Sequence, residues 1–197
     1  MSIIVELGTI GGSMTRTTSC VFCKIGMDGL SKFSNRYSRK VYEDDVCFAI
    51  LENEQSIIGY TLVILKEHKE TILDNSITDE QLVKFWRAVH KIGNRLKTVL
   101  GAENVYVCSL CDGVSHFHVH LAPRYKWMTQ NKERYSELFK ERDGEQSVKF
   151  STALGKIGGF WYLADTERDY NKTEFGRLSI DEKGKFLQDL ADRLKEI

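Results

Sequence analysis

The chain has 197 residues, and its 28 lysine and arginine residues are balanced by 28 aspartate and glutamate residues. The zero net charge argues against a dedicated polyanion-binding protein, and 42% hydrophobic residues are enough for a substantial core. The longest apolar stretch, residues 57–65, is too short to span a bilayer, and residues 1–19 show no secretory signal. We therefore expect a cytoplasmic protein that does not enter a membrane.

The predicted elements come in blocks and do not alternate as βαβ units. A block of strands, one long helix and further strands favour an α+β fold with a mainly antiparallel sheet, on which the long helix packs. Pro123, the single proline of the chain, is expected to stop the last strand. In chain order, we first expect strands at 41–42, 46–51 and 59–65, with a turn at 44–45 between the first two. A helix at 78–100 and strands at 104–110 and 115–122 follow. The rest of the chain is expected to contain a short helix at 132–142, an apolar segment at 158–163 that packs on the core, and a final helix after residue 179.

The two longest predicted helices have clear start signals. Thr78 can cap the first turn of the long helix, Gln81 can reach back to complete a capping box, and Gly101 can end the helix. Ser179 and Glu182 predict a second capping box for the final helix. The apolar stripes expected to face the core are 82, 85, 86, 89, 93, 96 and 100 in the long helix, and 186, 187, 190 and 194 in the final one.

The five cysteines indicate metal binding or catalysis. An odd number in a chain without a secretory signal speaks against a disulfide framework. Two Cys-x-x-Cys pairs occur, Cys20 with Cys23 and Cys108 with Cys111. In an extended strand the second pair would point to opposite faces, so it would chelate only at a bend. We expect Cys108 and Cys111, like Cys47, to be small buried hydrophobic residues.

The most informative segment is 116–122, His-Phe-His-Val-His-Leu-Ala. Because alternate side chains of a strand share a face, His116, His118 and His120 would line one face and the hydrophobic residues between them the other. With this histidine content, only about 0.003 such alternating runs are expected by chance. A solvated strand face usually carries threonine, lysine or glutamate, so three imidazoles indicate a functional site.

Neighbouring imidazoles suit chemistry at a phosphorus centre. Such rings offer a nucleophile that is neutral near pH 7, proton donors and metal ligands. A neutral histidine can attack phosphorus, and the covalent histidyl-nucleotide then breaks down with water or another acceptor. The turn at 111–114 contains Gly113, whose backbone N–H can approach a phosphate oxygen.

The segment 112–125, Asp-Gly-Val-Ser-His-Phe-His-Val-His-Leu-Ala-Pro-Arg-Tyr, resembles the signature of the histidine triad (HIT) superfamily of nucleotide hydrolases and transferases. The resemblance extends back through 41–45, Val-Tyr-Glu-Asp-Asp, and 59–68, Gly-Tyr-Thr-Leu-Val-Ile-Leu-Lys-Glu-His. It is specific, because motif, order and spacing agree. It implies a HIT-like fold over residues 20–125.

We accordingly divide the chain into three parts: a tail at 1–19, a HIT domain at 20–125, and a C-terminal helical extension at 126–197 that packs on the core. The extension either covers the site or takes part in a homodimer interface.

The resemblance also assigns roles to single residues. His118 would be the nucleophile that takes a nucleoside monophosphate from an α-phosphate. His120 would hydrogen-bond nearby backbone, hold the His118 ring in the right tautomer and face the phosphate. Glu52 falls where the family places an acidic or amide side chain on the ribose hydroxyls, with a solvated turn carboxylate as the alternative. Gly113 and Ser115 complete the expected substrate contacts.

Zinc is the cofactor that the resemblance implies. Zinc-bearing members of the superfamily use two N-terminal cysteines, a histidine after the strand preceding the long helix, and the first histidine of the triad. Here these are Cys20, Cys23, His68 and His116. Such a Cys₂His₂ set forms a closed structural site, which would pin the N-terminal segment to the catalytic strand. Reduced, unliganded cysteines are the alternative.

The segment 112–115 departs from the Gly-Gln-Ser/Thr that most hydrolases of the family carry shortly before the triad. Asp-Gly-Val-Ser is closer to the aprataxin-like branch, which removes AMP from DNA ends, but zero net charge and no obvious basic segment argue against nucleic acid as a partner. Hydrolase, transferase and phosphorylase activities therefore stay open. Candidate substrates are dinucleoside polyphosphates, nucleoside phosphoramidates and adenylylated compounds. The alternative from another class is a zinc-stabilised nucleotide-binding or interaction module with little turnover.

Overall fold

The computed structural model describes residues 20–28, 39–53, 55–111, 113–126, 128 and 174–195. The expectations for the tail, for a helix at 132–142 and for an apolar segment at 158–163 lie outside the described residues. Among the helices that are described, none combines the length and the apolar character needed to cross a membrane.

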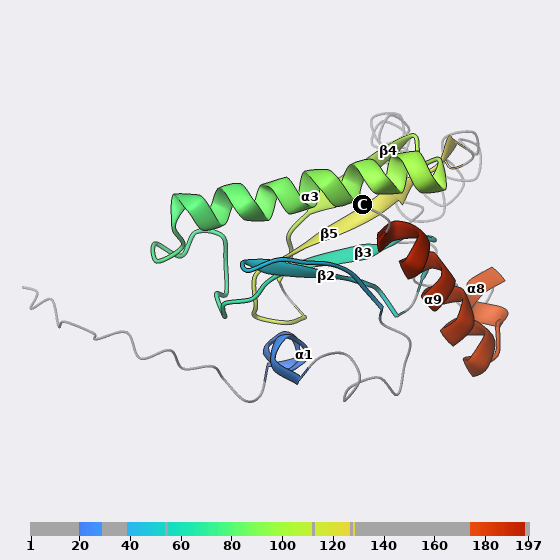
Figure 1. Cartoon of the computed structure of the whole chain (residues 1–197), viewed down its shortest axis with the longest axis horizontal. Helices are drawn as coiled ribbons and strands as arrows, with labels where there is room; N and C mark the ends of the chain where they lie inside the picture. The colour runs from blue at the N-terminus through green and yellow to red at the C-terminus, as the bar shows by residue number, and fades with distance from the viewer. Residues whose placement is uncertain are drawn as a thin grey trace, which may run out of the picture.

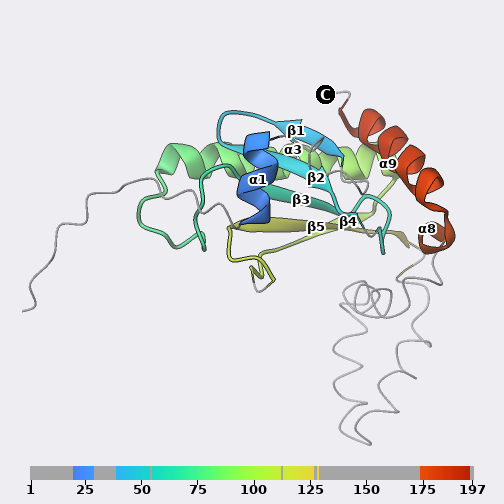
Figure 2. The same cartoon turned by 90° about the horizontal axis from the view of Figure 1, so that it is seen from below.

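A five-stranded antiparallel sheet forms the centre of the structure, with α3 across one face and α1 on the other (Figures 1 and 2). The strand order is β1-β2-β3-β5-β4, and every neighbouring pair is antiparallel. The predicted α+β fold with one long helix on the sheet is confirmed. The elements are α1 (Val21–Asp28), β1 (Lys40–Glu43), β2 (Cys47–Leu51), β3 (Thr61–Leu65), α3 (Asp79–Leu100), β4 (Asn104–Cys108), β5 (His118–Arg124), α8 (Glu174–Arg177) and α9 (Ile180–Lys195).

The two faces of the sheet belong to separate hydrophobic cores. The alternation of side chains along β2 and β3 sends successive residues to opposite faces. On the face under α1, Phe48, Ile50, Leu62 and Ile64 of the sheet pack with Phe22 and Ile25 of the helix. The face under α3 carries the larger core, which includes Ala49, Leu51, Val63, Leu65, Phe85, Val89 and Leu96.

Asp44 fixes the turn between β1 and β2. Its carboxylate Oδ1 accepts hydrogen bonds from the backbone N–H groups of Val46 at 2.8 Å and Cys47 at 2.7 Å. Its own N–H donates to the carbonyl of Cys47 at 3.0 Å. The predicted turn at this position is confirmed, because an aspartate side chain satisfies backbone donors that a tight turn leaves without partners.

Both predicted ends of α3 are confirmed. The side chain of Thr78 accepts from the Gln81 backbone N–H at 3.2 Å, and the side chain of Gln81 accepts from the Thr78 backbone N–H at 2.9 Å. Gly101 ends the helix with a left-handed φ of 70°.

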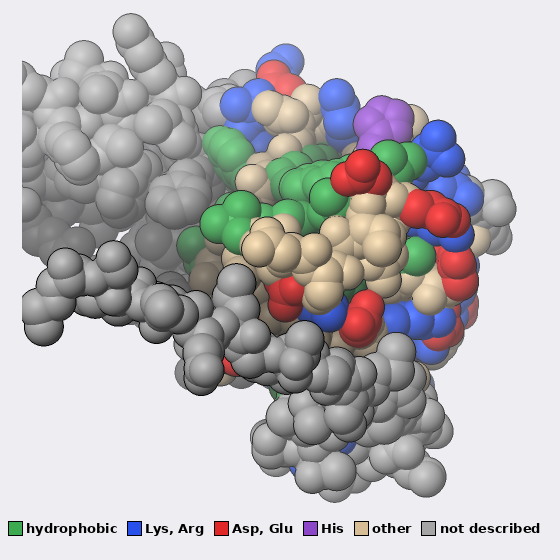
Figure 3. Space-filling view, turned by 90° about the vertical axis from the view of Figure 1, so that its left-hand side faces the viewer, with side chains coloured by type: hydrophobic (Ala, Val, Ile, Leu, Met, Phe, Trp, Pro, Cys, Tyr) green, Lys and Arg blue, Asp and Glu red, His purple; other side chains and the backbone are tan. Residues whose placement is uncertain are grey.

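Trp86 is the exception to the predicted stripe of α3. It lies about 100° further around the helix than Phe85, and 45% of its surface is exposed. The buried positions are instead Phe85, Ala88, Val89, Ile92 and Leu96. Hydrophobic side chains gather on the side of the molecule where α3 begins (Figure 3), and a shallow depression there is lined by Leu82, Val83, Trp86, Arg87 and His90.

The bounds predicted for the last strand of the sheet are wrong at both ends. The strand β5 begins at His118 and continues through Pro123. Its pairing with β3 ends where Leu121 lies opposite Thr61. Pro123 lies beyond that point, so its missing N–H removes no hydrogen bond from the β3 pair and the strand continues.

The final helix starts and packs as predicted. The Glu182 N–H donates to Ser179 Oγ at 3.4 Å, and the Ser179 N–H donates to the Glu182 carboxylate at 2.8 Å. The guanidinium of Arg95 in α3 donates to the carbonyl of Arg193 at 2.7 Å. The buried side of α9 joins the larger core through Leu187, Leu190, Ala191 and Leu194.

Substituting Gly59→Ala should destabilise the fold by about 2–4 kcal/mol, from left-handed strain together with overpacking. Gly59 has a φ of 91°, and an added Cβ would lie 2.6 Å from Leu100 Cδ1 and 3.1 Å from Pro123 Cγ. Gly93→Ala is the matched control, because among the described residues nothing beyond the backbone of its own helix lies within 4 Å of its Cβ position, and alanine favours the helix. Denaturant unfolding of both variants measures the difference. Equal midpoints for Gly59→Ala and the wild type would contradict this close packing.

Candidate functional site

The histidines of the triad lie on the α1 face of the sheet. His118 and His120 belong to β5, and His116 lies in the bend before it. His116 is fully buried, and His118 is only 5% exposed. The ring of Phe22 in α1 packs edge-on against both, with centroid distances of 5.8 Å to His116 and 4.9 Å to His118. The predicted division of faces is confirmed, because the residues between the histidines join the core under α3, namely Phe117, Val119 and Leu121.

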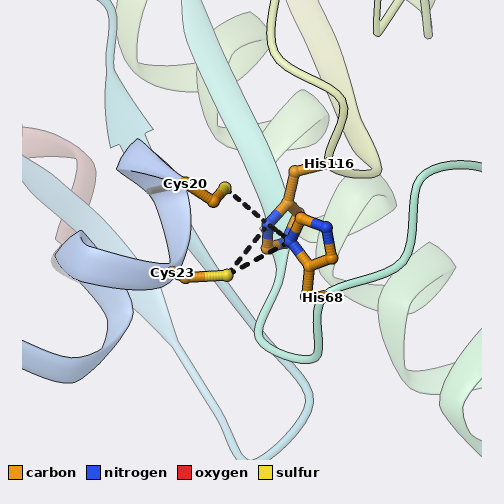
Figure 4. Close-up of side chains that lie close together, drawn as sticks. All are labelled: Cys20, Cys23, His68 and His116. Carbon is orange, nitrogen blue, oxygen red and sulfur yellow. Dashed lines mark hydrogen bonds between the residues drawn. The ribbon is translucent and has the colours of Figure 1, made fainter. Parts of the chain in front are cut away.

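The four residues predicted as metal ligands come together between α1 and the sheet (Figure 4). Cys20 and Cys23 come from the start of α1, and His68 from the loop after β3. Cys20 Sγ is 3.3 Å from His116 Nδ1, and Cys23 Sγ is 3.3 Å from His68 Nδ1. Cys23 Sγ is also 3.5 Å from His116 Nδ1, and the two Nδ1 atoms are 3.2 Å apart.

The donor atoms of this cluster fit a tetrahedral zinc ion. Typical Zn–N and Zn–S bond lengths at tetrahedral angles place ligand atoms about 3.3–3.8 Å apart, close to the separations here. His116 Nε2 lies 2.7 Å from the Leu65 carbonyl, which can only accept, so the ring proton is on Nε2 and Nδ1 offers its lone pair to the cluster. Burial lowers the pKa of His116, which favours the neutral form that binds metals.

The backbone of His116 fixes the tautomer of His118. His118 Nδ1 is 2.7 Å from the His116 carbonyl, so Nδ1 carries the proton and Nε2 keeps a lone pair. A neutral imidazole in this form can act as a nucleophile. The family resemblance assigned this positioning role to His120. In the structure the carbonyl two residues before His118 performs it, because the ring folds back within reach of that carbonyl.

His120 lies beside His118 and contacts a tyrosine. The centroids of the two imidazoles are 4.7 Å apart, and the Tyr60 hydroxyl is 2.9 Å from His120 Nδ1. Burial, with a smaller contribution from the neighbouring His118, lowers the pKa of His120 to about 4. His120 is therefore neutral at pH 7.

The ring of His120 should stay neutral in NMR titrations until the pH falls below about 5. Its folded pKa of about 4 lies below the usual value of 6.5. Between these two values the unfolded chain takes up a proton that the folded chain excludes. This contribution to stability is complete above pH 6.5 and is lost as the pH falls towards 4. Ring signals assigned with a His120→Gln variant measure the pKa, and a midpoint near 6.5 would contradict the burial of this ring.

Cys108 and Cys111 differ from the expected buried residues. Both are only partly buried, whereas Cys47 is fully buried as predicted. Cys111 has a left-handed φ of 57°, and its Sγ lies 3.8 Å from His118 Nδ1 and 3.3 Å from Ser109 Oγ. The bend therefore turns this thiol towards the triad.

The predicted substrate-binding residues lie in the loop after β2 and in the bend before β5. Glu52 follows β2, is partly buried, and accepts a hydrogen bond from the Asn53 N–H at 3.0 Å. Gly113 and Ser115 are exposed in the bend before β5, and apart from its chain neighbours no atom of the described residues lies within 4 Å of the Cβ position of Gly113. The Cβ side of Gly113 is therefore open, ahead of the buried histidines.

Comparison with known proteins decides the family. Residues 34–127 match the model of the HIT domain. An uncharacterized HIT-like protein from Borreliella burgdorferi is 36% identical over 115 residues, which cover 54% of this chain and 76% of that protein. The chain belongs to the HIT family. A HIT family protein from Bacillus anthracis of known structure is 34% identical, with 55% of this chain and 74% of that chain covered and a TM-score of 0.47. The adenylylsulfatase HINT3 of Arabidopsis thaliana is 29% identical over 145 residues, 69% of each protein.

Four residues around the HIT triad have no signal in the sequence that assigns them to the site. Phe22 covers His118 because α1 crosses this face of the sheet, and Tyr60 meets His120 through the pairing of β3 with β5. Ser109 donates to the His118 carbonyl at 2.8 Å. The thiol of Cys111 comes near His118 because the backbone of Cys111 is left-handed. Alternation within one strand cannot show contacts of this kind, since they depend on register and on a helix far away in the chain.

Proposed function

We propose that this chain is a nucleotidyl hydrolase or transferase that forms a covalent intermediate on His118. The observation that carries the proposal is the 2.7 Å contact between His118 Nδ1 and the His116 carbonyl, which leaves Nε2 unprotonated. Similarity to a protein named as an adenylylsulfatase supports an adenylylated compound as substrate.

The reaction balances in two displacements. His118 Nε2 attacks the α-phosphorus and an N–P bond forms, while the P–O or P–N bond to the leaving group breaks with its electron pair on the leaving oxygen or nitrogen. A leaving amine takes a proton from solvent, whereas sulfate leaves as the anion. Water or an acceptor hydroxyl then attacks the phosphorus. The N–P bond breaks, the electron pair returns to Nε2, and the proton of the attacking group passes to solvent.

The chemistry of the remaining residues supports their proposed roles. Glu52 would bind the ribose hydroxyls, whose O–H groups suit a carboxylate acceptor. The Gly113 N–H would bind a phosphate oxygen from the open bend, with Ser115 beside it. His120, neutral at pH 7, would face the phosphate without competing for the same proton as His118.

The cluster of two cysteines and two histidines would hold a structural zinc ion. With four protein ligands, such an ion supplies cross-linking rather than Lewis-acid chemistry, because no coordination position is left open. Cys20 and Cys23 would connect α1 to His68, in the loop after β3, and to His116, in the bend before β5, at the same end of this antiparallel strand pair.

Intact-protein mass spectrometry tests the proposed chemistry. The full chain is incubated with adenosine phosphosulfate, an adenosine phosphoramidate and a diadenosine polyphosphate, then quenched without acid, because N–P bonds hydrolyse in acid. We expect an AMP-sized adduct that peptide mapping assigns to His118. An adduct on another residue, or AMP release without any adduct on rapid quench, would contradict the covalent step.

A binding module with little turnover is the second candidate. Two observations favour it: the Asp-Gly-Val-Ser segment at 112–115, and the edge-on cover of Phe22 over a His118 that is 5% exposed. AMP binding measured by calorimetry, together with the lack of adduct and of nucleotide release from every donor, would support this reading.

A further inference from the structure

Tyr60 reaches the triad from the neighbouring strand. It directly precedes β3, and the register that pairs Leu62 with His120 brings its side chain to this ring. The hydroxyl is 2.9 Å from His120 Nδ1, and the two rings lie 5.9 Å apart at an angle of 31°. Both residues are partly buried. The phenol is therefore placed to act on His120 and not on the nucleophile itself.

A buried glutamine holds the backbone of Tyr60 in place. The amide of Gln55, only 1% exposed, donates to the carbonyls of Tyr60 at 2.9 Å and Glu52 at 2.7 Å. Its side-chain oxygen accepts from the Gly59 N–H at 2.7 Å, and the Glu52 N–H donates to the Tyr60 carbonyl at 2.9 Å. This network fixes both ends of the loop, so little conformational entropy is lost when Tyr60 meets His120.

The direction of the Tyr60–His120 hydrogen bond determines which nitrogen of His120 carries the proton. If the hydroxyl donates to Nδ1, the proton is on Nε2, which can then donate to a substrate oxygen. If Nδ1 donates to the hydroxyl, Nε2 is only an acceptor, as ionised phosphate oxygens are. Two acceptors facing each other would repel, so only the first arrangement suits a phosphate site.

We propose that Tyr60 is a positioning residue, which donates a hydrogen bond to His120 Nδ1 and thereby presents the His120 Nε2–H to an oxygen of the α-phosphate. This inference rests on the proposed function, since a phosphate is what Nε2–H would bind. The two neighbouring imidazoles then present different groups at Nε2 to the substrate, one an acceptor and the other a donor. His118 offers a lone pair because a carbonyl holds its Nδ1–H, and His120 offers a proton because a phenol occupies its Nδ1.

A pair of tyrosine variants separates positioning from structure. Tyr60→Phe removes the hydroxyl from His120, whereas Tyr125→Phe removes one that donates to the Ile58 carbonyl at 2.7 Å in the same loop. We expect kcat for AMP release to fall about tenfold in Tyr60→Phe, with KM changed less than about twofold, as for loss of one positioned hydrogen bond. Tyr125→Phe should keep kcat within about twofold of the wild type.

Nitrogen-15 spectra of the histidine rings give a readout that does not depend on turnover. With signals assigned by His120→Gln, the wild type and Tyr125→Phe should show His120 protonated at Nε2, and Tyr60→Phe should show both tautomers. A wild-type His120 protonated at Nδ1, or equal kcat values in the two phenylalanine variants, would overturn the inference. If the wild type releases AMP from no donor, the proposed function fails, and the ring spectra still decide the tautomer.

Discussion

Replacing His118 with alanine should lower kcat for AMP release by about 10⁴-fold or more, because the nucleophile itself is removed. The loss should be similar for every donor that the wild type uses, since each must pass through the same N–P bond. The hydrogen bond from Ser109 goes to the backbone carbonyl of His118 and is retained in the variant. Steady-state release and the adduct in intact-mass spectra measure the effect together.

Folding and metal content must be followed in the same samples, because His118 is buried. His90→Ala is the matched control: His90 is exposed on α3, beside Asn94, and its loss should leave kcat unchanged. A folded, metal-loaded His118→Ala protein with kcat within tenfold of the wild type would rule out His118 as the nucleophile.

Removing one cysteine of the metal cluster should have the largest effect on stability. An ion that binds only the folded chain contributes about 4 kcal/mol when its free concentration is a thousand times its Kd. Cys23→Ala removes a buried ligand atom that lies within 3.5 Å of both histidine Nδ1 atoms. We expect this variant to lose most of its zinc and to unfold at lower denaturant, close to the wild type treated with a chelator.

Cys108→Ala is the control for this experiment. Cys108 lies in β4, is partly buried, and does not belong to the metal cluster. Its loss should leave zinc content at one ion per chain and leave the response to chelator unchanged. A wild-type protein purified without zinc, whose unfolding does not shift on adding zinc or chelator, would show that the cysteines are reduced and unliganded.

Local sequence signals predicted the parts of this fold that depend on local chemistry. The capping boxes at Thr78 and Ser179 need only residues three positions apart, and both were found where expected. Alternation along one strand separated the histidines from Phe117 and its neighbours. The apolar stripe predicted for α3 was too wide, because helical spacing alone does not show that Trp86 lies outside the part of the helix that faces the sheet.

The coming together of the two cysteines and two histidines could be predicted only through family resemblance. These residues come from segments up to 96 residues apart, and no local pattern joins Cys20 to His116. The spacing of residues along the sequence also does not predict contacts that depend on neighbouring strands and bends. Pro123 stays in its strand because the partner strand ends earlier, and Tyr60 meets His120 because the register of β3 against β5 brings them together.

His116 contributes its ring to the cluster of Cys20, Cys23 and His68 and its carbonyl to His118, so one residue contacts both the cysteines at α1 and the proposed nucleophile. A change that rotates this residue would alter the basicity of His118 as well as the attachment of α1. Stability and reactivity therefore cannot be tuned independently here. Removal of the proposed zinc ion should therefore also produce a mixed population of His118 tautomers, which nitrogen-15 ring spectra measure.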